Sequence, residues 1–242
     1  AILATSTALL RVLQRKGKVA DFVAGHSLGE YSALVAANGI SFLDAVRLVR
    51  QRGRFMQEAV PLGQGTMAVI LGLELCQVKE VCHSAAQGEV VAPANVNAPD
   101  QVVIAGHCQA VGRAGDIARE RGAKRVLSLP VSAPFHCPLM KPAEIRLAEV
   151  ICQVPFSDLS IPLVNNVEAQ VVSKSKVVQE GLVKQVSSAV LWSDCVKRLV
   201  ASGVSTFVEV GPGRVLTGLI RRIAPTVESI SIQSREQLED YV

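Results

Sequence analysis

The pentapeptide Gly25-His26-Ser27-Leu28-Gly29 is the feature that most constrains how this chain can fold. It follows the apolar run 19–24 and precedes 30–37, a run of good helix formers. A serine at such a strand-turn-helix junction is typical of a nucleophile elbow, whose strained turn exposes the hydroxyl at the carboxyl end of a strand. We therefore predict that Ser27 is a nucleophile and that the backbone N–H of Leu28 stabilises an oxyanion. The alternative is a simple glycine-flanked turn.

Strands and helices are predicted to alternate along the segments on either side of residues 61–130. This alternation indicates an α/β fold with a mainly parallel sheet covered on both faces. The polar residues after 232 are expected to form a tail. The predicted helices cover residues 1–15, 28–37, 41–59, 142–152, 174–188, 194–202 and 214–223, and the predicted strands cover 19–24, 161–165, 206–210 and 228–232.

Residues 61–130 differ from the rest of the chain, because they are predicted to form short segments in the order β-α-β-β-α-β. This order is typical of a ferredoxin-like unit. We therefore predict a large domain of residues 1–60 and 131–242 and a small inserted domain of residues 61–130. Such an insertion would place a second wall over the nucleophile and create a cleft. The predicted strands here are 66–71, 90–95, 101–105 and 124–129, and the predicted helices are 76–86 and 109–121.

Arg52 is the second informative residue, because it lies on the apolar face of a predicted helix. That face is formed by residues at helical spacing: Phe42, Ala45, Val46, Val49, Met56 and Ala59. An arginine that points toward a core must be paired, since an isolated buried charge costs several kcal/mol. Its partner is either an internal acid or a substrate carboxylate held in two places by the guanidinium fork.

His136 is predicted to be the general base for Ser27. It lies in a loop between Pro134 and Pro138 and not on an apolar helix face, so it is not a typical core histidine. The remaining histidines lie inside the elbow or in the inserted segment: His26, His83 and His107. In α/β-hydrolases the base histidine lies near the C-terminus and follows an acid in the sequence, whereas His136 is far from the C-terminus. We therefore expect a carbonyl oxygen, in place of an acid, to orient this base.

Composition excludes several other classes of protein. The six cysteines show neither a Cys-x-x-Cys pair nor zinc-ligand spacing, which favours reduced thiols in the cytoplasm and no bound metal. A net charge of +4 with only 4% aromatic residues gives no platform for nucleic acid. Charged residues interrupt every apolar run before the roughly 18 to 20 residues that a membrane span requires.

Five segments in order resemble the bacterial malonyl-CoA:acyl carrier protein transacylase family, and together they extend over nearly all of the chain. They are 25–34, 51–57, 95–97, 136–140 and 208–213. The resemblance implies an α/β-hydrolase-like large domain with a ferredoxin-like small domain. It also implies an enzyme of fatty acid synthesis that needs no cofactor and has malonyl-CoA and acyl carrier protein as its partners. We expect this enzyme to be a cytoplasmic monomer.

The resemblance also assigns roles to individual residues. Ser27 resembles the family nucleophile, His136 its base, and Arg52 the arginine that binds the malonyl carboxylate. The other implied roles are an oxyanion N–H from Leu28, a main-chain carbonyl of Gln185 that orients the base, and substrate-binding positions at Met56, Asn95, Asn97 and Phe135.

One family feature is not present in the sequence: an N-terminal Gly-Gln-Gly-Ser-Gln, which supplies a second oxyanion N–H. We therefore expect the chain to be a fragment and a poor catalyst, since loss of one such donor typically costs about 100- to 1000-fold in rate. Two other functions stay open. One is a serine thioesterase or esterase, and the other is a non-catalytic carrier-docking module that uses basic residues such as Arg113, Arg119, Lys124, Arg125, Lys197 and Arg221.

Overall fold

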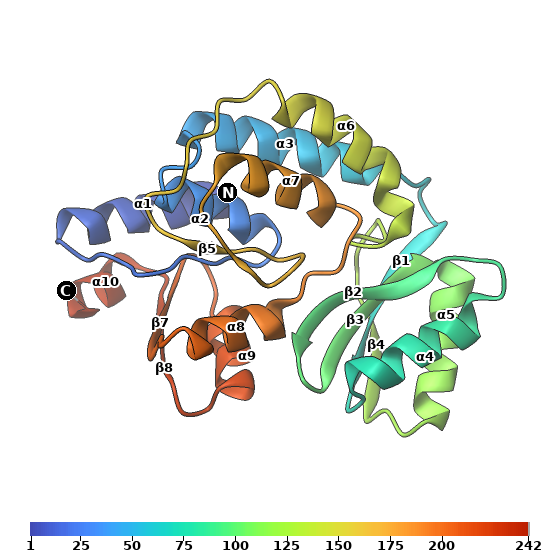
Figure 1. Cartoon of the computed structure of the whole chain (residues 1–242). Helices are drawn as coiled ribbons and strands as arrows, with labels where there is room; N and C mark the ends of the chain where they lie inside the picture. The colour runs from blue at the N-terminus through green and yellow to red at the C-terminus, as the bar shows by residue number, and fades with distance from the viewer. Residues whose placement is uncertain (242) are drawn as a thin grey trace. The chain divides into compact units, whose positions relative to one another are not determined.

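The computed structural model describes residues 1–241, in which helices and strands succeed one another along the chain (Figure 1). The predicted α/β class is confirmed. The chain divides into two compact units, which are described separately. Unit 1 contains Ala1–Val49, Val154–Gln179 and the residues from Ser193 onward, and unit 2 contains Arg50–Gln153 and Glu180–Trp192. Within residues 1–241, every helix is too short or too polar to span a lipid bilayer.

Unit 1 is built around short strands and the helices that follow them. Strands β7 (Thr206–Val210) and β8 (Glu228–Ile232) pair in parallel, and α9 (Val215–Ile223) connects them. Leu13, Ile232 and Leu238 form a buried apolar cluster beside this pair. The other elements that lie wholly or mostly in this unit are α1 (Ile2–Arg15), α2 (Leu28–Ala36), β5 (Leu163–Val164), β6 (Val171–Val172), α8 (Trp192–Ala201) and α10 (Arg235–Tyr241).

The strand predicted at 19–24 forms only a single parallel bridge, between Val23 and Leu163. The Val23 N–H donates to the Pro162 carbonyl at 2.9 Å, and the Val164 N–H donates to the Val23 carbonyl at 3.0 Å. Regular pairing ends here because the chain then bends into the turn around Ser27. The serine turn therefore starts directly beside β5.

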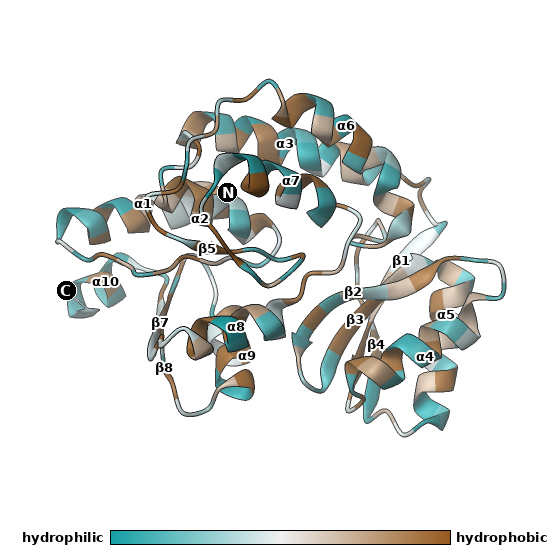
Figure 2. Cartoon of the chain, viewed as in Figure 1, coloured by the Kyte–Doolittle hydropathy of each residue, from teal (hydrophilic) through white to brown (hydrophobic). Residues whose placement is uncertain are grey.

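Unit 2 contains a four-stranded antiparallel sheet with the strand order β2-β3-β1-β4. Along the chain its elements run strand, helix, strand, strand, helix, strand, as predicted. Figure 1 shows both helices on one face of the sheet, and each carries apolar and polar residues around its circumference (Figure 2). The elements are β1 (Gly65–Leu71), α4 (Leu75–Ala86), β2 (Val91–Ala98), β3 (Gln101–His107), α5 (Cys108–Glu120) and β4 (Arg125–Ser128).

The two faces of this sheet have different partners, because successive residues of a strand point to opposite sides. Ile70 and Ile104 belong to the apolar core shared with α4 and α5. Met67 and Val103 belong to a second core, against which Phe135 packs. The sheet therefore supports the loop that contains His136. A 3-10 turn (Pro138–Met140) and helix α6 (Lys141–Ile151) follow this loop.

Helices α3 (Phe42–Glu58) and α7 (Ser175–Gln185) contribute residues to both units. In unit 1, the Asp158 carboxylate accepts hydrogen bonds at the start of α7, from Lys174 Nζ at 2.7 Å and from the Ser175 N–H at 2.9 Å. The hydrogen bond from the Lys174 side chain, followed by that from the Ser175 backbone, lowers the pKa of Asp158 from 3.8 to about 2.

The lowered pKa of Asp158 predicts an acid-dependent contribution to stability. The folded-state pKa lies below the unfolded value, so the contribution is present above about pH 4 and is lost as the pH falls toward about 2. We expect Asp158→Asn to unfold at a lower urea concentration than the wild type at pH 7. The difference in unfolding free energy should shrink as the pH falls through this window, and a difference that stays constant would contradict the assignment.

Candidate active site

The serine turn has the strained geometry of a nucleophile elbow. Ser27 directly precedes α2 and has a φ of +52°, a value that non-glycine residues rarely adopt. A Cβ atom on Gly25 would lie 2.0 Å from the carbonyl carbon of Gly29, so only glycine fits at position 25. A Cβ atom on Gly29 would meet nothing within 4 Å. Gly25 therefore relieves crowding at the turn, and Gly29 matters through its closely approached backbone.

Two buried residues that sequence reasoning missed hold this turn. The Ser27 N–H donates to Asn166 Oδ1 at 2.7 Å, and Asn166 Nδ2 donates to the Gly25 carbonyl at 2.8 Å. The Asn166 N–H in turn donates to Glu30 Oε2 at 3.3 Å. Asn166 is fully buried and Glu30 is 2% exposed. No local pattern in the sequence could have identified Asn166, because it lies 139 positions from Ser27.

In unit 2, His136 is buried in its loop with a φ of +58° and contacts a main-chain carbonyl. Its Nδ1 lies 2.8 Å from the carbonyl oxygen of Gln185. A carbonyl oxygen can only accept, so Nδ1 carries a hydrogen in this contact. This contact is the one that the family resemblance implies.

Arg52 contacts the same glutamine. It is 7% exposed, and its Nη2 donates to the side-chain oxygen of Gln185 at 3.0 Å. The inward direction predicted for Arg52 is thus observed, and Met56 lies buried one turn further along α3. The structure therefore brings together three of the predicted site residues, with Gln185 in contact with both Arg52 and His136.

The segment that contains Gln185 is fixed on two sides within unit 2. The Ser187 hydroxyl donates to the Glu144 carboxylate, which also accepts from Lys141 Nζ at 2.5 Å. Further along, the Val190 N–H donates to the Ala94 carbonyl of β2 at 2.9 Å. These attachments hold the Gln185 carbonyl in place for His136, which is the support that a preorganised site requires.

The second half of α3 is fixed in the same way. The Arg146 guanidinium lies 4.1 Å from the centre of the Phe55 ring, and Arg146 Nη1 donates to Glu58 at 2.7 Å. The Ser132 hydroxyl donates to Gln57 Oε1 at 2.6 Å. Hence the helix that carries Arg52 is attached both to α6 and to the loop that contains His136.

The remaining predicted site residues are found in both units. Asn95 and Asn97 lie on β2, where Asn95 is buried and Asn97 is half-buried. Phe135 packs against the sheet core. Leu28 is the first residue of α2, half-buried in unit 1. The roles implied for these four residues stay predictions.

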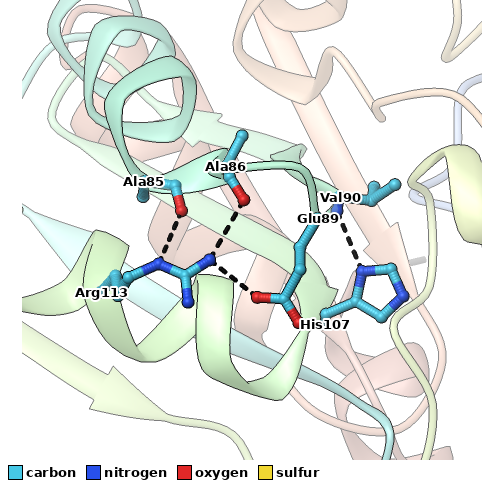
Figure 3. Close-up of polar contacts among 6 residues, drawn as sticks. All are labelled: Ala85, Ala86, Glu89, Val90, His107 and Arg113. Atoms are coloured by element: carbon cyan, nitrogen blue, oxygen red, sulfur yellow. Dashed lines mark hydrogen bonds and ion pairs between the residues drawn. The ribbon is translucent and has the colours of Figure 1, made fainter.

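One basic residue named as a possible docking contact has a structural role. Arg113 Nε donates to the Ala85 carbonyl at 2.9 Å, and Nη2 donates to the Ala86 carbonyl at 3.1 Å and to Glu89 at 2.7 Å (Figure 3). These bonds satisfy the last carbonyl groups of α4, which have no partner within the helix. Beside them, His107 Nδ1 accepts the Val90 N–H at 2.9 Å (Figure 3). Arg113 therefore caps the C-terminus of α4.

A serine on a strained turn and a buried histidine held by a main-chain carbonyl are the residue types that serine acyl-transferring enzymes use, and both lie in an α/β fold. Sequence comparison agrees: the family model described as "Acyl transferase domain" matches residues 1–236, so the chain belongs to that family. A relative named malonyl CoA-acyl carrier protein transacylase, from Escherichia coli (strain K12), is 50% identical over 233 residues, which are 96% of this chain and 75% of the relative.

Solved structures give the same result. The crystal structure of an acyl carrier protein S-malonyltransferase from Vibrio cholerae has a TM-score of 0.97 and 47% identity, covering 99% of this chain and 79% of that one. A malonyl-transacylase in complex with its holo type II PKS acyl-carrier protein has a TM-score of 0.96 and 47% identity, covering 98% and 77%. The resemblance inferred from the five sequence segments is thereby confirmed.

Proposed function

We propose that this chain is an acyltransferase that moves a malonyl group from coenzyme A to the phosphopantetheine thiol of acyl carrier protein, and so supplies fatty acid synthesis. Membership of the acyl transferase domain family and the names of its relatives support this function. A neighbour solved with an acyl-carrier protein supports the choice of acceptor.

The observation that carries the proposal is the double use of Gln185. Its main-chain carbonyl contacts His136 and its side-chain oxygen contacts Arg52, so a proton acceptor and a fixed cation share one neighbour. A substrate that uses both must have a carboxylate close to its reacting carbonyl group. A malonyl thioester meets this requirement and an acetyl thioester does not. The guanidinium of Arg52 can bind such a carboxylate through two parallel hydrogen bonds.

In the first half of the proposed reaction, His136 Nε2 takes the proton of the Ser27 hydroxyl while Oγ attacks the thioester carbonyl carbon. The N–H of Leu28 stabilises the oxyanion of the tetrahedral intermediate. The carbon-sulfur bond then breaks, and the proton on His136 passes to the departing coenzyme A sulfur. The product of this half-reaction is malonyl-Ser27.

In the second half, the phosphopantetheine thiol gives its proton to His136 and its sulfur attacks the ester carbonyl. The bond to Ser27 Oγ breaks, and the serine regains its proton from His136. Arg52 holds the malonyl carboxylate throughout, which keeps the acyl group oriented toward the incoming thiol. One thioester replaces another, so we propose that the reaction requires no cofactor.

The test of this function is the mass of the intact protein after brief exposure to malonyl-CoA. We expect the mass to increase by one malonyl group located on Ser27, with a much smaller increase from acetyl-CoA. Failure of Ser27 to become acylated would contradict the proposal and favour a non-catalytic docking role.

The alternative of a thioesterase is distinguished by the fate of the acyl group. With radiolabelled malonyl-CoA and acyl carrier protein bearing phosphopantetheine, we expect the label to pass to the carrier thiol. Release of free malonate at the same rate with and without the carrier would show hydrolysis and would contradict the proposal.

The finer description of the fold and the location of the protein are part of the same proposal. We propose an α/β-hydrolase-like large domain of residues 1–60 and 131–242 and a ferredoxin-like small domain of residues 61–130. The antiparallel order β2-β3-β1-β4 supports the small domain, and the parallel pair β7 and β8 supports the large one. We propose a cytoplasmic location, which is supported by the six cysteines, all of them free thiols.

A further inference from the structure

Asn166 replaces backbone pairing at the point where the segment around Val23, which is paired with β5, enters the serine turn. Val23 is paired with β5 through main-chain hydrogen bonds on both sides. Two residues later, the Gly25 carbonyl accepts a hydrogen bond from Asn166 Nδ2. The Ser27 N–H donates to Oδ1 of the same side chain. The carboxamide thus binds the main chain on both sides of His26, as a peptide group of a neighbouring strand would.

Both contacts of this side chain require an amide. The Ser27 N–H is a donor and needs the oxygen, whereas the Gly25 carbonyl is an acceptor and needs the nitrogen, so only one orientation of Asn166 satisfies both. An aspartate keeps the first contact but turns a carboxylate oxygen toward the carbonyl of Gly25. An alanine removes both contacts. The site is therefore specific for asparagine.

The position of this contact coincides with the strain. Ser27 has a φ of +52°, and such a conformation persists only where surrounding groups determine it. Asn166 is fully buried, and its own N–H donates to Glu30 in the first turn of α2. The contacts of Asn166 thus join the residues before, at and after the nucleophile.

We propose that Asn166 is a positioning residue for the nucleophile: its carboxamide holds Ser27 in the strained conformation that directs the hydroxyl and the following N–H toward the substrate. This inference rests on the proposed acyl transfer at Ser27. A misplacement of about 1 Å at a reacting group can cost on the order of 100-fold in rate. Loss of the two hydrogen bonds of the Asn166 side chain should therefore slow acylation while leaving substrate binding through Arg52 almost unchanged.

The test compares Asn166→Asp with Asn165→Asp, a matched control. Asn165 is also buried, and its Oδ1 accepts the Gln170 N–H at 3.0 Å, a bond that an aspartate retains. We expect Asn166→Asp to lower the rate constant for acylation of Ser27 by malonyl-CoA by about 10- to 100-fold, with KM within about 3-fold. Asn165→Asp should acylate within about 3-fold of the wild type. The proposal would be overturned if both variants acylated at the wild-type rate, or if both lost the same factor in rate.

Two further measurements keep the test decisive. If Asn166→Asp does not fold, Asn166→Ala is measured in its place, and hydrogen exchange is followed in the wild type. In the wild type, the Ser27 amide should exchange slowly, and exchange as fast as in an exposed loop would overturn the proposal.

A serine-reactive fluorophosphonate, which needs neither Arg52 nor a carrier, should also react more slowly with the Asn166 variant than with the wild type. A wild type that reacts with this probe but not with malonyl-CoA would contradict the proposed function and leave the role of Asn166 testable.

Discussion

Replacement of Ser27 by alanine should lower malonyl transfer by roughly five to six orders of magnitude, because removal of the nucleophile alone abolishes most of the catalysis in enzymes of this kind. The variant should take up no radiolabel from malonyl-CoA under conditions in which the wild type is acylated. Its fold should be retained, since the main-chain contact of residue 27 with Asn166 does not involve the hydroxyl.

The matched control is Ser32→Ala on the same helix. The Ser32 hydroxyl is buried and makes no hydrogen bond, so its removal should leave both stability and labelling near those of the wild type. Persistent labelling of the Ser27→Ala protein would place the nucleophile elsewhere and would contradict the proposed mechanism.

Replacement of Arg52 by alanine should lower kcat/KM for malonyl-CoA by on the order of 100- to 1000-fold, which is the usual cost of removing one partner of a buried charge pair. Acetyl-CoA has no carboxylate for Arg52 to bind, so its slow reaction should change little. The measurement is the ratio of the two kcat/KM values in the wild type and in the variant. Arg52→Lys should give an intermediate loss for malonyl-CoA, because an ammonium group lacks the two-pronged geometry of a guanidinium.

Arg50→Ala provides the control for this prediction. Arg50 lies two residues earlier on α3 and is exposed, so its removal tests a general change in charge. In the Arg50→Ala variant, the ratio of the kcat/KM values for malonyl-CoA and acetyl-CoA should match that of the wild type. Equal losses for malonyl-CoA and acetyl-CoA in Arg52→Ala would mean that Arg52 serves only an internal contact, and the proposed substrate anchor would be wrong.

Local chemistry made much of the fold predictable. Strands β7 and β8 begin and end at the predicted residues. The helix predicted at 41–59 is α3, and its start has a local cause: the Asp44 N–H donates to Ser41 Oγ at 3.1 Å, and that hydroxyl donates to Asp44 Oδ2 at 2.6 Å. In such segments the residues that determine the structure are close neighbours in the sequence.

The errors occur where distant contacts decide the structure. The residues after 232 were predicted to be a polar tail, but Arg235–Tyr241 form helix α10. That helix is stabilised by burial of Leu238 in a core with Leu13 and Ile232 and by an ion pair of 2.7 Å between Arg235 and Glu239. Two apolar residues in seven, Leu238 and Tyr241, are too few to establish a periodicity, so the sequence alone could not indicate that this segment would pack.

The same distinction applies to the site. Ser27 and the inward-facing Arg52 were identified from local patterns, a glycine-flanked turn and a helical face. The partners that hold them, Asn166 and Gln185, lie 139 and 133 positions away. Gln185 was found only through the family resemblance, and Asn166 was missed because its neighbours in the sequence show neither a motif nor a periodicity.

Gln185 contacts His136 through its main chain and Arg52 through its side chain. Every amino acid provides the carbonyl oxygen, but few provide the amide. Under the proposed function, mutation at this one position should therefore change the contact of Arg52 while the main-chain contact of His136 is kept. Substrate preference would then change separately from the proton acceptor.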